Sequence, residues 1–252
     1  MNIHDVTLYK DDNVLVVNKP SGLVVHGDGK SSEYSLVDMV MEEYPEMKEV
    51  GEPMEIEHKG EKKTILRPGI VHRLDKDTSG VMILARNQDT FLFLKSQFQN
   101  RETKKVYRAF VYGNIKDEVG IIDAQIGRSP SDIRMWSAGR GKRGTLRDAV
   151  TLFSVLGRGL DKDTSERVTY VELSPKTGRT HQLRVHMKFN QTPIIADPLY
   201  APNRPFILDF ERLALHAHEL SIELPGLGIK TFTAPLPDDF ERALSLMEPL
   251  QV

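Results

Sequence analysis

Residues 67–86, RPGIVHRLDKDTSGVMILAR, constrain the fold more than any other stretch of the chain. Two apolar, β-prone runs at 70–71 and 81–85 enclose a polar segment at 75–80 made of residues that suit tight turns. This order predicts a strand, a loop and a second strand. Asp75 would then lie where the first strand ends, held by a scaffold but open to solvent, which suits a reactive carboxylate.

Three interpretations of this polar segment compete. It can be a surface hairpin whose Asp and Thr side chains bond their own backbone. It also matches the first half of an EF-hand calcium loop. However, Arg86 occupies the twelfth position, where that loop needs glutamate, and a strand-like run follows in place of a helix. The third interpretation is a catalytic Asp75, with Arg73 two residues before it.

The stretch from His72 to Gly80 resembles the H-R-L-D-x-x-T-S-G pattern of the RluA-type pseudouridine synthases, with every fixed position filled. Further blocks resemble the family in the same order: Asn18-Lys19-Pro20-x-Gly22, Lys105-x-Tyr107, Gly178-Arg179-Thr180-His181-Gln182-Leu183-Arg184-Val185-His186 and Asp197-Pro198-Leu199-Tyr200. The resemblance runs from about residue 8 to about residue 240. The glycines that often bracket the last block in the family are Ala196 and Ala201 here.

The resemblance implies an isomerase that turns specific uridines of tRNA or rRNA into pseudouridine. The reaction breaks the bond from uracil N1 to ribose C1′ and rejoins the base through C5, so we expect no cofactor. Asp75 would supply the carboxylate, either by attacking C1′ or by removing the C2′ proton. The family pattern implies Arg184 as the cation that keeps this carboxylate ionised, and Tyr107 as a flat face for the flipped uracil.

Several residues become candidates for RNA binding. Arg73 and His72 could fill the stack that a flipped base vacates, Lys19 belongs to a block that flanks the family's cleft, and Thr180 and His181 begin the helix predicted for about 180–190. On that helix His181, Arg184 and Lys188 share one face. His181 and His186 are five residues apart, which is wrong for a two-histidine metal pair, and we predict no metal.

Charge is segregated along the chain, although the net formal charge is only −2. Residues 127–147 hold six basic residues and one acidic residue, with Trp136 and four glycines among them. This suits a phosphate backbone and an exposed base, although a plain solvated loop is the alternative. The RNA-binding candidates here are Arg134, Arg140, Lys142 and Arg143. Residues 42–63 hold eight Glu against four Lys and should lie away from RNA.

The pattern of many strands, hairpins and few helices predicts an α+β fold with a largely antiparallel sheet. The family fold implies that this mixed sheet is bent, with flanking helices and a central active-site cleft. We expect one catalytic domain over 1–252, with an acidic surface insertion at about 46–66 and without the family's N-terminal RNA-binding domain. Other expected elements are strands in 1–34, including 23–25, helices capped by Ser35 and Asn87, a strand at 104–113, and paired strands at 148–156 and 167–173.

The chain has no cysteine, no run of about 18 to 20 apolar residues and no signal-peptide pattern at its start. We therefore expect a cytoplasmic protein with no membrane partner, acting as a monomer on an RNA stem-loop. Two other functions remain open at this stage. A non-catalytic RNA-binding or ribosome-assembly protein could keep the same fold. A carbohydrate hydrolase would need a second carboxylate as its acid partner, and no second Asp or Glu stands out in the matched blocks.

Overall fold

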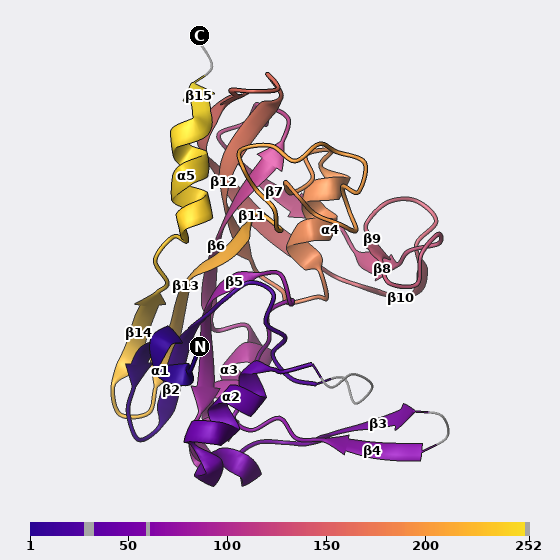
Figure 1. Cartoon of the computed structure of the whole chain (residues 1–252). Helices are drawn as coiled ribbons and strands as arrows, with labels where there is room; N and C mark the ends of the chain where they lie inside the picture. The colour runs from indigo at the N-terminus through magenta and orange to yellow at the C-terminus, as the bar shows by residue number, and fades with distance from the viewer. Residues whose placement is uncertain (28–32, 59–60, 250–252) are drawn as a thin grey trace. The chain divides into compact units, whose positions relative to one another are not determined.

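A computed structural model describes residues 1–27, 33–58 and 61–249 of the chain (Figure 1). The chain forms two compact units, each built from two separate segments. The first unit consists of residues 1–104 and 219–234, and the second consists of 105–218 and 235–252. The chain passes between the units three times: at the start of β6, within β13 (Leu215–Leu224), and between Ala234 and Pro235.

The first unit combines an antiparallel sheet with one helix of four residues and three longer helices. Its strand order is β1 (Thr7–Lys10), β2 (Val14–Lys19) and β5 (Ser79–Ala85), and the later half of β13 pairs with β14 (Gly228–Thr233). The helices are α1 (Ile3–Val6), α2 (Leu36–Glu43), the 3-10 helix η1 (Pro45–Glu49) and α3 (Gln88–Asn100). All seven residues of β5 are buried, as the continuous apolar run 81–85 predicts for a central strand.

Both predicted helix caps of this unit are confirmed. Ser35 begins α2 by accepting the N–H of Asp38, whose carboxylate accepts the N–H of Ser35 in return. Asn87 begins α3 by accepting the N–H of Thr90 at 2.9 Å. Pro45 ends α2 because proline cannot continue a helix.

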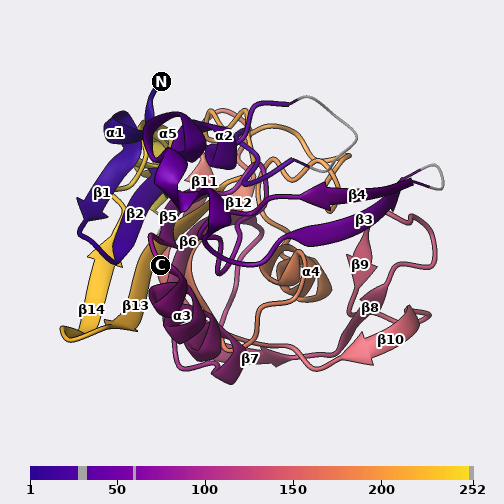
Figure 2. The same cartoon turned by 90° about the horizontal axis from the view of Figure 1, so that it is seen from below.

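The acidic insertion forms a hairpin of β3 (Met54–His58) and β4 (Glu61–Ile65) that pair only with each other. Figures 1 and 2 both show this hairpin projecting from the rest of the first unit. The stretch expected to be an acidic surface insertion, 46–66, therefore contains this hairpin.

The second unit has two sheets. Its larger sheet orders β6 (Lys104–Tyr112), β12 (Arg167–Pro175) and β11 (Val150–Asp161), and both β7 (Val119–Asp123) and β15 (Met247–Pro249) pair with β11. The smaller sheet orders β10 (Arg143–Arg147), β8 (Ile126–Arg128) and β9 (Trp136–Ser137). Two helices, α4 (Gln182–Phe189) and α5 (Asp238–Leu246), complete the unit, and α4 packs against β9 and β12.

The α+β class with a mostly antiparallel sheet is thus confirmed, as are the strands predicted at 104–113, 148–156 and 167–173. The expectation of a single catalytic domain with a central cleft stays a prediction. No helix in the described part of the chain is long and apolar enough to span a membrane.

Two strand predictions were wrong. Residues 23–25 form no strand: Val24 makes one bridge to Ser35, and the chain turns instead at Gly22, whose φ is +83°. Residues 70–71 also form no strand, since Ile70 makes a single bridge to Leu84 before the chain bends. Both runs are apolar because they pack inside the first unit, and burial alone does not require a ladder of backbone hydrogen bonds.

Candidate active site

Asp75 lies in an irregular segment that leads into β5, between the buried Leu74 and a turn at Lys76-Asp77. Its side chain is half-buried, and its carbonyl accepts the N–H of Thr78 at 3.2 Å. The turn is also held from outside. The N–H of Gly22 donates to the Lys76 carbonyl at 3.0 Å, and the Ser21 hydroxyl donates to the Asp77 carbonyl at 2.7 Å. The backbone beside Asp75 is therefore fixed by contacts on both of its C-terminal neighbours.

Lys19 is the central anchor of this turn. Its side chain is fully buried, and its Nζ donates to the carbonyls of Lys76 at 2.9 Å, Pro20 at 2.8 Å and Leu23 at 2.7 Å. An ammonium offers three donors, and here three backbone oxygens accept them. Lys19 has no exposed surface and joins the two turns. A contact of Lys19 with RNA stays a prediction.

The two residues before Leu74 differ in exposure. The ring of His72 stacks on Phe98 of α3, with centroids 4.5 Å apart, and its Nε2 accepts the N–H of Ile83 at 3.1 Å. Arg73 is exposed. It lies close enough to His26 for its charge to help lower the pKa of that histidine, for which burial is the main cause. Of the pair, Arg73 is the one that presents a cation to solvent.

Arg184 lies on α4 in the second unit and is almost completely buried. Its Nε and Nη2 donate to the two carboxylate oxygens of Asp197, each at 2.8 Å. This two-point pair has the geometry in which guanidinium and carboxylate bind most strongly. The sequence analysis did not select Asp197, although it quoted the block to which Asp197 belongs. Any further anion must approach the guanidinium through the edge that carries Nη1.

Asp197 also organises the loop that follows it. One of its carboxylate oxygens accepts the N–H groups of Leu199 and Tyr200, both at 2.9 Å. The ring of Tyr200 then faces the Arg184 guanidinium, whose central carbon is 5.1 Å from the ring centroid. Tyr200 thus packs against the cation that its own loop helps to hold. It is the second residue of this site that the sequence analysis missed.

The start of α4 differs from the prediction. Thr180 is exposed and does not cap the helix, since His181 is the residue at the cap, with a φ of +55° and no side-chain capping bond. The Gln182 side chain closes the turn instead, because its carbonyl oxygen accepts from the Thr177 hydroxyl at 2.7 Å and from the Arg179 N–H at 3.0 Å. Nδ1 of His181 is 3.0 Å from the hydroxyl of Tyr200.

Buried polar groups connect α4 to the larger sheet. The Gln182 amide donates to the Thr151 hydroxyl at 3.1 Å, and that hydroxyl is 2.9 Å from Nδ1 of His186. Nε2 of His186 is 3.0 Å from the Ala124 carbonyl, which can only accept, so Nε2 carries the proton. Burial lowers the pKa of His186 below its usual range. This network holds the helix that carries Arg184.

The two tyrosines of β6 have different surroundings. Tyr112 is fully buried and donates its hydroxyl to the Pro205 carbonyl at 2.6 Å. Tyr107 is half-buried, pairs in register with Leu173 and packs against the edge of the core. Tyr112 is therefore the packing residue, and Tyr107 keeps part of its surface exposed.

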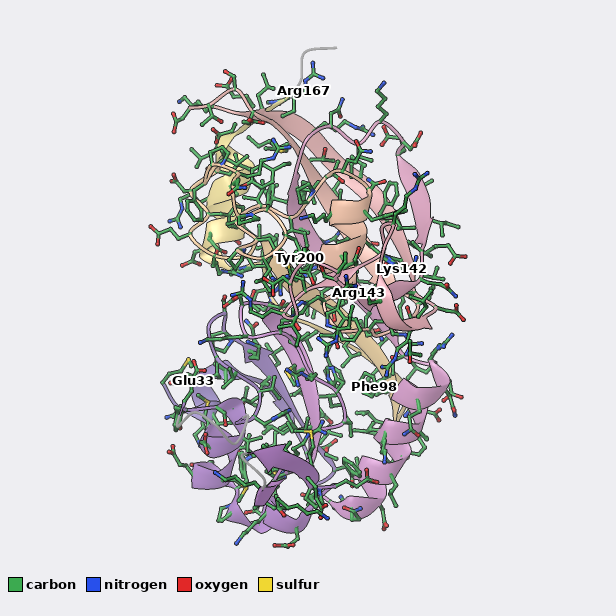
Figure 3. The ribbon with its side chains drawn as sticks, turned by 90° about the vertical axis from the view of Figure 1, so that its right-hand side faces the viewer. Glu33, Phe98, Lys142, Arg143, Arg167 and Tyr200 are labelled. Carbon is green, nitrogen blue, oxygen red and sulfur yellow. The ribbon has the colours of Figure 1, made fainter. Side chains whose placement is uncertain are left out.

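The basic segment 127–147 forms the small sheet β8–β10 and its connecting loops. Arg140 and Arg143 are exposed, and Lys142 is partly exposed and donates to the Ala138 carbonyl at 3.3 Å (Figure 3). Arg134 is engaged by Asp132, which accepts from its Nη2 at 2.7 Å. The guanidinium of Arg128 covers the Trp136 ring at 4.2 Å, so that ring already has a cation on one face. Exposed positive charge on this sheet and its loops therefore comes mainly from Arg140, Arg143 and Arg147.

The predicted catalytic residues divide between the units. Asp75 belongs to the first unit, and Tyr107 and Arg184 belong to the second. Their union in one active site stays a prediction. In the described ranges, no group of three or more histidine, aspartate or glutamate side chains is arranged to hold a metal ion.

Comparison with known proteins defines the class of enzyme as an isomerase that acts on RNA. The family model for RNA pseudouridylate synthase matches residues 13–189, more than half of the chain and including Asp75, Tyr107 and Arg184. The chain therefore belongs to the RNA pseudouridylate synthase family and, by its relatives, to the RluA-type synthases.

Among these relatives, an uncharacterized RNA pseudouridine synthase of Bacillus subtilis (strain 168) is 39% identical over 232 residues, covering 92% of this chain and 69% of that protein. The ribosomal large subunit pseudouridine synthase D of Borreliella burgdorferi is 36% identical over 246 residues, covering 97% and 69%. The solved structure of human RNA pseudouridylate synthase domain containing 4 is 29% identical, with a TM-score of 0.70 and coverage of 96% of this chain and 93% of that chain.

Proposed function

We propose that this chain isomerises specific uridines of rRNA or tRNA to pseudouridine, with Asp75 as the catalytic carboxylate. The observation that carries the proposal is the anchored turn beside Asp75. A reactive group must be held in place by contacts that do not themselves take part in the chemistry. The bonds from Lys19, Ser21 and Gly22 to the two carbonyls after Asp75 provide that support through the backbone.

Asp75 acts in its ionised form. Either it attacks ribose C1′ as the bond to uracil N1 breaks, or it removes the proton from C2′. In both routes the released uracil stays bound, turns, and forms a new bond from C5 to C1′. This step breaks the bond between Asp75 and C1′ in the first route, and C2′ regains its proton in the second. C5 then loses its proton, and N1 gains one. Atoms and charge balance without a further reactant. The position of Asp75 on a half-buried loop, and not inside the core, is compatible with either route.

Arg184 and Tyr107 complete the proposed chemistry. Arg184 provides a guanidinium that favours the ionised form of a nearby carboxylate. Asp197 holds it through Nε and Nη2 and so directs its other edge toward the substrate. Tyr107 offers the flat face for the loosened uracil, and its hydroxyl assists removal of the C5 proton. Its partial exposure supports this role better than the buried Tyr112.

RNA is proposed to follow the exposed cations of the small sheet. Arg140, Lys142 and Arg143 would contact phosphates. Arg134 would attract a phosphate more weakly, because it already forms an ion pair with Asp132. Arg73, exposed two residues before Asp75, would fill the stack that the flipped uridine leaves. His72 would support Arg73 from its stack on Phe98, and Thr180 and His181 would meet the strand at the start of α4.

The substrate proposal draws on the names of the relatives. Several are ribosomal large subunit pseudouridine synthases, which favours rRNA, with tRNA as the second choice. We propose an unpaired loop of a stem-loop as the target, because unstacked bases reduce the cost of flipping by a few kcal/mol. The enzyme would act as a monomer in the cytoplasm, where such RNA is made and folded.

A genetic experiment tests the proposal. Pseudouridines are mapped in total RNA from cells without the gene and from the same cells carrying wild-type, Asp75→Asn or Asp77→Asn protein. Asp77 is half-buried in the same turn, and its carbonyl is the atom that Ser21 contacts, so its amide variant is a matched control. We expect wild type and D77N to restore the same sites and D75N to restore none. Restoration by D75N would instead favour a non-catalytic RNA-binding role.

A further inference from the structure

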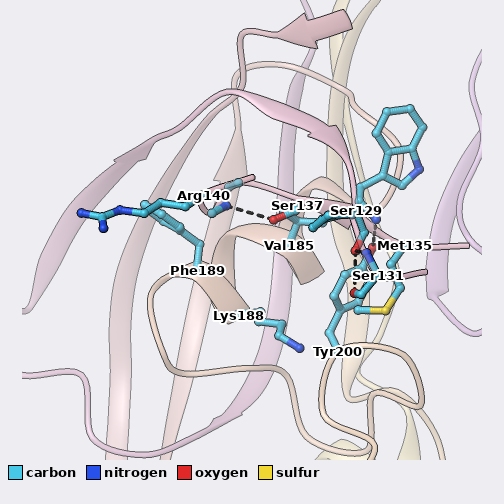
Figure 4. A pocket seen from close by; sticks show the side chains of 13 residues that line it. Ser129, Ser131, Met135, Ser137, Arg140, Val185, Lys188, Phe189 and Tyr200 are labelled. Atoms are coloured by element: carbon cyan, nitrogen blue, oxygen red, sulfur yellow. Dashed lines mark hydrogen bonds between the residues drawn. The ribbon is translucent and has the colours of Figure 1, made fainter. Parts of the chain in front are cut away.

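The second unit contains a hollow of about 330 Å³ between the end of α4 and the segment that surrounds β9 (Figure 4). Its wall combines the last turn of the helix with the loops before and after β9. The lining residues are Ser129, Pro130, Ser131, Met135, Trp136, Ser137, Ala138, Gly139, Arg140, Val185, Lys188, Phe189 and Tyr200. This volume is at the lower end of the range for small-molecule sites.

The charge of the hollow is one-sided. Arg140 and Lys188 line it, and none of its lining residues is acidic. Among the described residues neither cation takes part in an ion pair, unlike Arg134, which Asp132 engages. Two unpaired cations around one hollow attract an anion, because no neighbouring carboxylate offsets their field.

The hollow also offers an aromatic face and hydroxyl groups. Phe189, at the C-terminal end of α4, is 49% exposed, and Figure 4 shows it beside Arg140 at the end of the hollow away from Tyr200. Ser129 and Ser131 lie at the Tyr200 end, with their hydroxyl oxygens 3.1 Å apart. Lys188 points toward this second end. A flat apolar ring and polar groups with cations at both ends suit a nucleotide within a strand.

Tyr200 connects the hollow to the proposed active site. It lines the hollow, and its hydroxyl accepts the N–H of Trp136 at 3.0 Å. The Arg184 guanidinium packs on the same tyrosine ring, 5.1 Å from its centroid. The hollow and the cation proposed to act on the target uridine therefore share one side chain as a wall. A residue bound in the hollow would be a near neighbour of the target along the RNA.

We propose that this hollow is a subsite for one unpaired nucleotide that flanks the target uridine. The base stacks on Phe189, while Lys188 and Arg140 contact the phosphates on its two sides. The serine hydroxyls at the Tyr200 end meet polar groups of the sugar or base. The subsite selects RNA in which a residue near the target can leave its stack, and it rests on the proposed function of Asp75 and Arg184.

The test combines abasic RNA with matched variants. Each nucleotide within a few positions of the target is replaced by an abasic residue, and kcat and KM for pseudouridine formation are measured for wild type, Lys188→Ala and Phe189→Ala. Lys162→Ala and Phe206→Ala are the controls, since both residues are exposed in the same unit and outside the hollow. We expect K188A and F189A to raise KM about tenfold with kcat nearly unchanged, and the controls to stay within twofold.

One abasic position should raise KM for wild type about tenfold. The same abasic position should not raise KM further in F189A, because removal of the ring has already ended the stacking contact that the base would make. The inference is overturned if F189A and F206A give equal KM values, or if the effects of F189A and of every abasic position simply multiply. Failure of the proposed function looks different: in that case wild type itself forms no pseudouridine on any RNA.

Discussion

Replacement of Lys19 by methionine tests whether the turn beside Asp75 is held as described. Methionine keeps the length of the side chain and removes the ammonium that donates to the carbonyls of Pro20, Leu23 and Lys76. The Lys76 carbonyl keeps a second donor, the N–H of Gly22, so two oxygens lose the donor described here. Removal of the buried ammonium also removes the free-energy cost of burying a charge, and this effect stabilises the variant.

The balance favours destabilisation. Each buried carbonyl left without a donor costs about 1–3 kcal/mol, and replacement of a buried charge by a well-packed apolar group recovers part of that cost. We therefore expect Lys19→Met to lower the free energy of unfolding by about 3 kcal/mol. The rate of pseudouridine formation should fall even where the protein is fully folded, since the turn after Asp75 loses its anchor.

Urea unfolding gives the stability change, and hydrogen exchange of the Thr78 amide, which bonds to the Asp75 carbonyl, gives the local effect. Lys48→Met is the control, because Lys48 is exposed in the same unit, and it should change stability by less than about 0.5 kcal/mol. The reasoning is refuted if K19M unfolds at the same urea concentration as K48M and modifies RNA at the wild-type rate.

Three further predictions concern the second unit. Asp197→Asn removes the carboxylate that the buried Arg184 guanidinium binds and should lower the free energy of unfolding in urea by about 3 kcal/mol. The control Asp209→Asn, at an exposed ion pair 3.9 Å long, should lower it by less than about 0.5 kcal/mol. Equal urea midpoints for the two variants would contradict this prediction. Ala196→Gly should raise the free energy of unfolding by about 0.5–1 kcal/mol, because Ala196 has a φ of +54°, where a side chain is strained. Ala201→Gly should give no such gain, because Ala201 lies outside the left-handed region. A loss of thermal stability in A196G would contradict the inferred strain at Ala196. Burial lowers the pKa of His186 from 6.5, so as pH falls the unfolded chain takes up a proton on this ring before the folded chain does. The stability that the neutral ring provides is therefore complete above about pH 6.5 and lost as pH falls toward the folded pKa. NMR should show no titration of the ring near pH 6.5.

Local sequence rules predicted the elements whose signals are local. Ser35 and Asn87 cap helices because a short polar side chain meets a backbone N–H two or three residues ahead. The long pair β11–β12 follows from two strand-like runs separated by a polar turn.

The failures have a common physical cause. Residues 23–25 and 70–71 are apolar because they pack against the first unit, and an apolar run of two or three residues does not tell a strand from a buried loop. Thr180 is a good cap by type, but the Gln182 side chain satisfies the turn first. In each case a contact from elsewhere in the fold decides the local structure.

The candidate site residues were selected by their pattern. The blocks around Asp75 and Arg184 single out these residues by type and order, and their roles stay predictions. Their partners could not be predicted in the same way, because Lys19 acts through a contact 57 residues away and Asp197 through one 13 residues away. The quoted block that contains Asp197 and Tyr200 held the only local signal for them.

The central claim is that the carboxylate of Asp75 performs the isomerisation. The most direct measurement is the rate of pseudouridine formation in a single turnover by purified wild type, Asp75→Asn and Asp77→Asn on one RNA, with the Kd for that RNA measured in parallel. We predict that D75N binds RNA with a Kd within about threefold of wild type, since one amide replaces one carboxylate at a residue that we propose to contact the ribose. It should form no pseudouridine above background, while D77N keeps the wild-type rate. A D75N protein that binds RNA and still converts uridine at the rate of D77N would contradict the account.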